Sequence, residues 1–177
     1  MLVEGHGRWA GSEQALRDDE DVARLDLDVG GHVAALDQVL ALLVQSGRSL
    51  PHALMMLVPQ AYESDGTLDA SLRAFYEYHA GLVEPWDGPA SLVFSDGLRI
   101  GAMLDRNGLR PARYVVTDDD RVVLASEVGV LPVAAEKVRI KGRLQPGKML
   151  LVDLAVGKIL GDAEIKAAIS NAQPYGK

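Results

Sequence analysis

The sequence predicts an α+β fold in which helices come first and antiparallel strands follow. From Val33 to Val83 the apolar residues recur at three- and four-residue spacing, which is the period of a helix with one buried face. After Pro85 the period changes to two, and the alternating runs are separated by Asp-Gly, Asn-Gly and Pro-Gly turns. Helices followed by strands and tight turns are typical of a layered α+β domain.

Three helices are expected in the first half of the chain. The first starts at Val33 and ends at Gly47, and its apolar face holds Leu36, Val39, Leu40 and Leu43. The second starts at Pro51, whose missing N–H suits a first helical position, and it stops at Pro59. The third covers Asp69–Val83, with Asp69 as the N-cap because its carboxylate can accept hydrogen bonds from first-turn amides.

Period-two runs between turn residues predict strands in the second half. They are Pro89–Ser95, Leu98–Leu104, Arg113–Thr117, Val122–Ser126, Val138–Lys141, Lys148–Asp153 and Lys158–Leu160. A last helix over Asp162–Asn171 closes the chain. The pairs Asp96-Gly97 and Asn107-Gly108 supply the positive φ angles that tight hairpins need.

Composition narrows the class of protein. The 177 residues, 48% of them apolar and 24% charged, are enough for one globular domain. The net charge of −7 argues against a nucleic-acid partner, and no apolar run approaches the roughly 20 residues of a membrane span. The chain has no cysteine, which rules out disulfides, zinc–thiolate sites and a cysteine nucleophile within it. We expect a cytoplasmic protein without a bound metal.

The N-terminal segment differs from the rest of the chain. The first 28 residues hold eight acidic residues and three arginines, so they carry −5 of the total charge of −7. Such a bias predicts a solvated, poorly ordered arm over residues 1–30, followed by one domain over residues 31–177. The alternative is an acidic arm that docks onto a partner.

Six motifs point to a known family. They are Gly47–Ala53 (GRSLPHA), Arg73–His79 (RAFYEYH), Glu84–Ala90 (EPWDGPA), Asp105–Tyr114 (DRNGLRPARY), Ala125–Gly129 (ASEVG) and Lys141–Gly147 (KGRLQPG). In this order and spacing, over about Ala34–Lys177, the chain closely resembles the C-terminal portion of the class II glutamine amidotransferase domain of bacterial glutamate synthase large subunits.

The resemblance implies a partial N-terminal-nucleophile sandwich, in which two sheets pack between helix layers. In that family an N-terminal cysteine attacks glutamine, and its own α-amino group serves as the base. The released ammonia is used for glutamate synthesis from 2-oxoglutarate by other domains, which hold FMN and an iron–sulfur cluster. The resemblance implies no cofactor in this chain. It also implies that the partner is the rest of a glutamate synthase large subunit, or a second copy of the chain.

The catalytic machinery of the family has no counterpart here. The chain starts with Met1, and its Asn107-Gly108 pair lies in the Asp105 motif rather than in the family's oxyanion segment. The family's aspartate that holds the glutamine α-amino group aligns with His32, and a neutral imidazole accepts only one hydrogen bond. Asp28 is the alternative partner for that ammonium group. We therefore expect the chain alone to be inactive.

The remaining candidate site residues lie in two motifs. Each of these residues is expected to have a structural role or to support, without touching the substrate, the sheet that carries the nucleophile in the family. They are Asp105, Arg106, Asn107, Gly108, Arg110, Ser126 and Glu127. One interpretation is a hairpin loop locked by salt bridges, with Arg110 paired to Glu127. The other is an anion site built from the arginines of the loop.

Several other polar residues have plainer interpretations. His79 lies on the apolar face of the third expected helix and is predicted to be a satisfied core histidine, whereas His52 is predicted at the surface or in a cap. Trp86 is predicted to pack in the core. A strand with period two would place four basic residues on one face, which is solvated or docks onto an acidic partner: Lys137, Arg139, Lys141 and Arg143.

Two explanations of the chain as a whole stay open. It is either a piece of a larger, interrupted reading frame or a self-standing relative with a non-catalytic role. In both cases the loss of half the strands of a two-sheet sandwich would expose sheet edges and apolar faces. We therefore expect marginal stability, or pairing with another chain.

Overall fold

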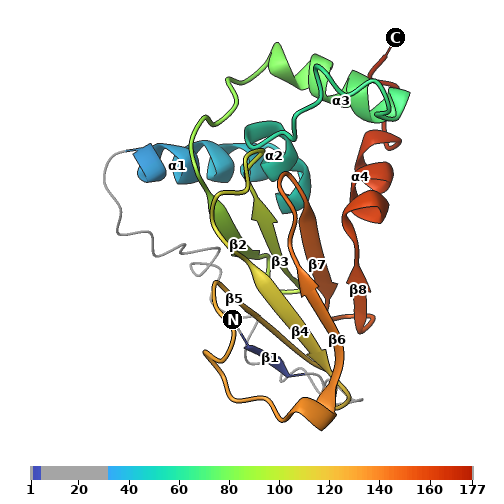
Figure 1. The fold of residues 1–177 in the computed structure, drawn as a ribbon. Coiled ribbons are helices and arrows are strands. Elements are labelled where there is room, and N and C mark those ends of the chain that lie inside the picture. The colour runs from blue at the N-terminus through green and yellow to red at the C-terminus, as the bar shows by residue number, and fades with distance from the viewer. Residues whose placement is uncertain (1, 5–31, 177) are drawn as a thin grey trace.

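A computed structural model describes residues 2–4 and 32–176 (Figure 1). The helices are α1 (His32–Gln45), α2 (Leu50–Leu57), α3 (Ala70–Ala80) and α4 (Asp162–Ser170), with a short 3-10 helix η1 at Ala135–Lys137. The strands are β1 (Leu2–Glu4), β2 (Ser91–Ser95), β3 (Arg99–Leu104), β4 (Arg113–Thr117), β5 (Arg121–Ala125), β6 (Val138–Arg143), β7 (Met149–Asp153) and β8 (Lys158–Leu160). The predicted α+β order of elements is confirmed.

Local sequence signals set most of the element ends. The Asp69 carboxylate caps α3 by accepting from the backbone N–H groups of Ser71 and Leu72 at 2.9 and 3.2 Å, as predicted. α3 ends at Ala80 rather than at the predicted Val83, because the chain turns at Gly81 and the carbonyl of His79 accepts the next amides. Strand β1 was not predicted: it lies within the expected arm over residues 1–30, the rest of which is outside the described residues.

The strands form two antiparallel sheets of four. Sheet A has the order β1-β5-β4-β6, and sheet B has the order β2-β3-β7-β8. The connections β2–β3, β4–β5 and β7–β8 are hairpins, as their turn residues predict. The loops after β3 and β6, however, each cross from one sheet to the other. The prediction that the Asn107-Gly108 turn closes a hairpin is therefore wrong.

The layers run from the helices through sheet B to sheet A. The larger core lies between the helices and one face of sheet B, and it includes the fully buried Leu54, Met55, Phe75 and Met103. Burial of each of these side chains stabilises the fold by about 1.5–3 kcal/mol. The other face of sheet B packs on sheet A, through Ala102, Leu104, Leu150 and Val152 against Val116, Val122 and Leu124.

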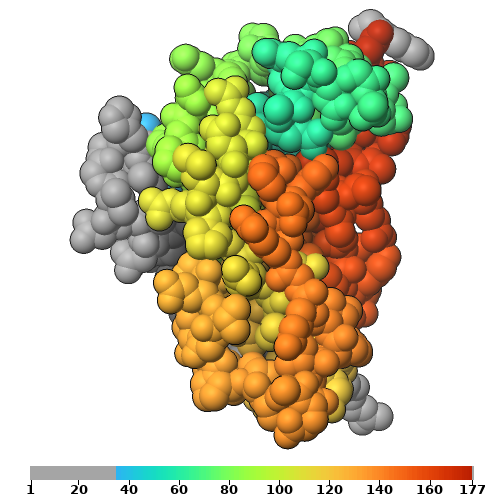
Figure 2. Space-filling model, viewed as in Figure 1, coloured from blue at the N-terminus to red at the C-terminus, as the bar shows by residue number. Residues whose placement is uncertain are grey.

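No helix covers the outer face of sheet A among the described residues. That face is lined by Val115 and Val123 and is overlaid by the loop of residues 127–135. In Figure 2 the helices form the upper and right-hand surface, whereas the orange segment with this loop and β6 forms the lower surface. Within the described part of the chain, no helix is both long enough and apolar enough to span a membrane.

Strand β6 carries a bulge that changes the predicted faces. Thr117 pairs with Val138 and Val116 pairs with Ile140, so Arg139 is an extra residue with no partner on β4. As a result Val138 lines the same pocket as Lys141, although the two residues are three positions apart and would lie on opposite faces of a regular strand. The prediction that all four basic residues of this segment share one face is therefore wrong, although each of them is exposed, as expected.

Candidate functional site

The Asp105 motif forms a loop that joins sheet B to sheet A. Asp105 directly follows β3 and is only 2% exposed. Its carboxylate accepts hydrogen bonds from the backbone N–H groups of Ala90 at 3.1 Å, Asn107 at 2.9 Å and Gly108 at 3.3 Å. All these donors belong to the main chain, so the carboxylate fixes the shape of the loop and its lone pairs are not directed at a ligand.

Gly108 and the turn before β7 lock the other side of this loop. Gly108 has φ +58°, and a Cβ atom there would lie 2.6 Å from Cγ of Pro146. The N–H of Gly147 donates to the carbonyl of Asp105 at 2.8 Å. A side chain at Gly108 would combine backbone strain with a steric clash, which explains why glycine occupies the position.

Arg106 and Arg110 of the loop do not build an anion site. Arg106 forms an exposed ion pair with Asp87 at 2.9 Å. Arg110 is exposed, and among the described residues it forms no ion pair with Glu127 or with any other carboxylate. The predicted Arg110–Glu127 pair is thus wrong: the loop is held by main-chain hydrogen bonds to Asp105 instead of by a salt bridge across the motifs.

The two motifs nevertheless meet at one end of the sandwich. Arg113 at the start of β4 pairs with Ala125 at the end of β5, which places Ser126 and Glu127 at the end of sheet A where the Asp105 loop enters. Both side chains are exposed. Asn107 is exposed as well, so the predicted residues converge on one end of the fold but form no closed catalytic cluster.

A buried lysine beneath this end was not predicted. Lys166 of α4 is 2% exposed. Its ammonium group donates to Asp162 and to the carbonyl of Gly147, both at 2.7 Å, and also to the side-chain oxygen of Gln60. Burial lowers the pKa of Lys166 from 10.5 to about 8, although the carboxylate of Asp162 acts in the opposite direction. The only sequence signal was the spacing of Asp162 and Lys166 on one face of the expected helix.

Two histidines meet between α2 and α3. The Nε2 atoms of His52 and His79 are 3.2 Å apart, and Nδ1 of His79 lies 2.8 Å from the carbonyl oxygen of Phe75. A carbonyl only accepts, so Nδ1 of His79 carries the hydrogen and its Nε2 accepts from His52. Burial lowers the pKa of both rings, that of His52 to about 4, and neighbouring charge adds to the effect.

The burial of His79, His52 and Trp86 tests the predictions for these three side chains. His79 is 3% exposed and hydrogen-bonded, which confirms the prediction of a satisfied core histidine. His52 was predicted at the surface or in a cap. Its side chain is partly buried against His79, so the surface position is only partly right, and its backbone N–H donates to the N-cap residue Ser49 at 3.4 Å. Trp86 packs against the helical core, as predicted.

His32 is the first residue of α1, but its side chain lies outside the described residues, as do Asp28 and the rest of residues 5–31. The role of His32 at the position of the family's aspartate stays a prediction. Within residues 2–4 and 32–176 there is no group of three or more side chains that could hold a metal ion. The whole sequence contains no cysteine thiol.

The comparisons with known proteins identify the family. The chain matches the class II glutamine amidotransferases over residues 14–177 and belongs to that family. The match starts before Ala34, where the motif-based resemblance begins, and so includes part of the acidic segment.

The most informative relatives are glutamate synthases. The chain is 50% identical over 148 residues to the glutamate synthase (NADPH) large chain of Bacillus subtilis. This alignment covers 84% of this chain and 10% of the relative. It is 48% identical over 171 residues to the chloroplastic ferredoxin-dependent glutamate synthase of Oryza sativa subsp. japonica, covering 95% of this chain and 10% of the relative. It is 45% identical over 181 residues to the glutamate synthase (NADH) of Saccharomyces cerevisiae, and this alignment covers 98% of this chain and 8% of the relative. The chain therefore spans about a tenth of the length of these relatives.

Proposed function

We propose that this chain supplies the scaffold portion of the glutaminase domain of a glutamate synthase and does not hydrolyse glutamine by itself. The observation that carries the proposal is the absence of any cysteine from a chain that belongs to the class II amidotransferases. Without a thiolate no thioester with glutamine can form in this chain. The Asp105 carboxylate cannot substitute, because its oxygens accept three main-chain hydrogen bonds.

The proposed role of the Asp105 loop and the turn at Gly147 is to hold a neighbouring nucleophile segment in place. The Asp105 loop, the turn at Gly147 and Lys166 are joined by hydrogen bonds into one rigid end of the sandwich. A rigid support of this kind helps an active site, because small displacements of reacting groups are costly. In this proposal the nucleophile comes from the rest of a glutamate synthase large subunit, in the cytoplasm, and the reaction is ammonia release for glutamate synthesis.

The cofactors implied by the resemblance do not fit this chain. Ligation of an iron–sulfur cluster requires cysteine thiolates, and the sequence has none. The sequence also lacks the glycine-rich motifs that cradle phosphate groups in nucleotide sites. We propose that FMN and the cluster are bound by other parts of the parent enzyme.

The test is a glutaminase assay with the purified chain. Glutamate release from glutamine is expected to stay at the level of a heat-denatured control. The same chain is then mixed with a separately produced N-terminal segment of a family member that has the nucleophilic cysteine implied by the resemblance. Turnover only in the mixture supports the proposal, whereas turnover by the chain alone refutes it.

A second candidate is a non-catalytic interaction module on the same half-fold. The pocket on the outer face of sheet A favours it, because this pocket is about 250 Å³ in volume and mostly apolar. This role predicts a defined complex that requires the acidic residues Glu4–Asp28. A mixture that shows no turnover, together with such a complex, would favour this second function.

A further inference from the structure

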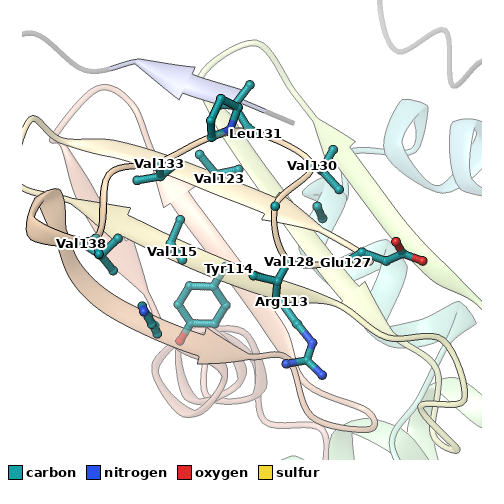
Figure 3. Close-up of a pocket in the computed structure, with 15 residues that line it drawn as sticks. Arg113, Tyr114, Val115, Val123, Glu127, Val128, Val130, Leu131, Val133 and Val138 are labelled. Atoms are coloured by element: carbon teal, nitrogen blue, oxygen red, sulfur yellow. The ribbon is translucent and has the colours of Figure 1, made fainter.

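The outer face of sheet A combines an apolar pocket with positive charge that has no ion-pair partner among the described residues. Val115 and Val123 form its floor, and the loop of residues 127–135 forms its wall with Val128, Val130, Leu131, Pro132 and Val133. Val128 is 80% exposed and Val130 is 66% exposed, so water reaches apolar side chains that could be buried by an occupant. Figure 3 shows the valines of the strands and the loop facing the same space, with Arg113 and Glu127 at one end.

Three cations lie on the same face. Residues directly opposite each other in an antiparallel pair share a face, and here Arg113 is opposite Arg143 while Val115 is opposite Lys141. Within residues 2–4 and 32–176, none of these three side chains has an ion-pair partner. The basic residues at the other end of the sheet are compensated, since Lys137 and Arg139 pair with Asp119 and Asp120.

Two arginines directly opposite each other are unfavourable unless an anion bridges them. Like charges at such a position destabilise a sheet, and guanidinium groups bind carboxylates in bidentate geometry. Glu127 lines the same pocket, but it is a single acid against three cations. A second copy of this face would bring like charges together, so the occupant should be acidic and should carry spaced apolar side chains.

The chain itself contains a segment of this composition. Residues 12–28 have seven acidic residues and two arginines, a net charge of −5, and they also carry apolar residues: Ala15, Leu16, Val22, Ala23, Leu25 and Leu27. The segment belongs to the connection between β1 and α1, and Leu2 of β1 pairs with Val123 on the floor of the pocket. An extended connection of residues 5–31 reaches up to about 90 Å, so its length does not restrict access to this face.

We propose that the outer face of sheet A is a docking site for the chain's own acidic segment, residues 12–28. Carboxylates of the segment pair with Arg113, Lys141 and Arg143, and its apolar side chains enter the pocket above Val115 and Val123. The segment thereby covers the sheet face that lacks a helix. This proposal does not depend on the proposed catalytic role.

The test uses the full chain with its acidic segment neutralised, so that the face is vacant. The neutralised chain carries Asp18→Asn, Asp19→Asn, Glu20→Gln and Asp21→Asn. A fluorescently labelled synthetic peptide of residues 12–28 is titrated against it, and binding is followed by anisotropy. We expect binding that weakens with added salt and that is at least about ten-fold weaker after Arg113→Glu and Arg143→Glu.

Controls separate docking from general charge effects and from misfolding. Lys158→Glu changes another exposed cation, on sheet B, and should leave peptide binding unchanged. Circular dichroism checks that each variant is folded, and Lys141→Glu provides a second disruption of the face. In the otherwise unaltered chain, neutralising the segment should increase hydrogen exchange in residues 127–135.

Two results would overturn the proposal. One is peptide binding that is absent, or equal in the neutralised chain and in its Arg113→Glu/Arg143→Glu variant. The other is concentration-dependent dimerisation that the arginine substitutions abolish while no peptide binds, because a second copy would then be the occupant of the face.

Discussion

The buried Lys166 of α4 gives the sharpest test of how the end of the sandwich that contains the Asp105 loop is held together. Replacing Lys166 with methionine keeps an unbranched side chain, one heavy atom shorter, but removes its positive charge and three donors. The carboxylate of Asp162 then loses one partner, although it keeps Lys148 at 3.0 Å and the N–H of Met149 at 2.9 Å. Removal of one member of a buried ion pair costs about 3–5 kcal/mol, and the remaining partners place this case near 3 kcal/mol.

The assay is urea unfolding followed by circular dichroism, with Lys158→Met as the matched control. Lys158 also pairs with a carboxylate, Glu164, but both side chains are more than half exposed, so the free energy of unfolding should fall by at most about 1 kcal/mol. For Lys166→Met we expect a loss of about 3 kcal/mol, or a melting temperature lowered by about 6–12 °C. Equal losses for the two variants would refute the claim that Lys166 anchors this end.

The same residue gives a pH dependence of known sign. The pKa of Lys166 is lowered from 10.5 to about 8 in the folded chain, so the unfolded chain binds more protons between these values. Stability therefore rises with pH from about 8 to 10.5 through this group, and it does so because an amine that is costly to bury charged becomes neutral. Lys166→Met should lack this rise. A rise of the same size in the variant would assign it to other groups.

Two further predictions concern the loop and the histidine pair. Gly108→Ala should lower the free energy of unfolding by about 2–4 kcal/mol, because it combines a positive φ with a clash against Pro146. The control is Gly97→Ala, which has φ +84° and no atom near the added Cβ, and it should lower the free energy of unfolding by only about 1–2 kcal/mol. Equal losses for the two variants in urea unfolding would rule out the clash. The free energy of unfolding should also fall by on the order of 2 kcal/mol as the pH drops from about 6.5 to 4. In this range His52 stays neutral in the folded chain because its pKa is lowered to about 4, whereas the same side chain is protonated in the unfolded chain. His52→Gln should flatten this dependence in acid titrations monitored by circular dichroism, and an unchanged slope would contradict the role of the His52–His79 contact.

Sequence reasoning found the elements and the family but only part of the candidate site. It located the Asp105 loop and the Ser126–Glu127 segment and predicted structural roles for them. It predicted that an Arg110–Glu127 ion pair stabilises the loop, whereas in the structure the loop is stabilised by hydrogen bonds from main-chain amides to the Asp105 carboxylate. Charged residues in two motifs look like partners in a sequence, but their contact depends on where the loops cross between sheets.

The sequence by itself determined what short-range forces control. Helix caps such as Asp69, turn glycines such as Gly97 and the period of apolar residues act within about four residues of the chain, so they can be read directly. The absence of a cysteine, and with it the lack of a thiol nucleophile, is equally a property of the sequence.

Only the tertiary structure decided which distant residues meet. Lys166 binds Gln60 across 106 positions, and His52 meets His79 across 27, because packing of α4, α2 and α3 brings them together. The bulge at Arg139 reverses the faces of a strand whose sequence alternates regularly. These features arise from the pairing of whole elements, and the energy of such pairing is a sum over many contacts that no local pattern contains.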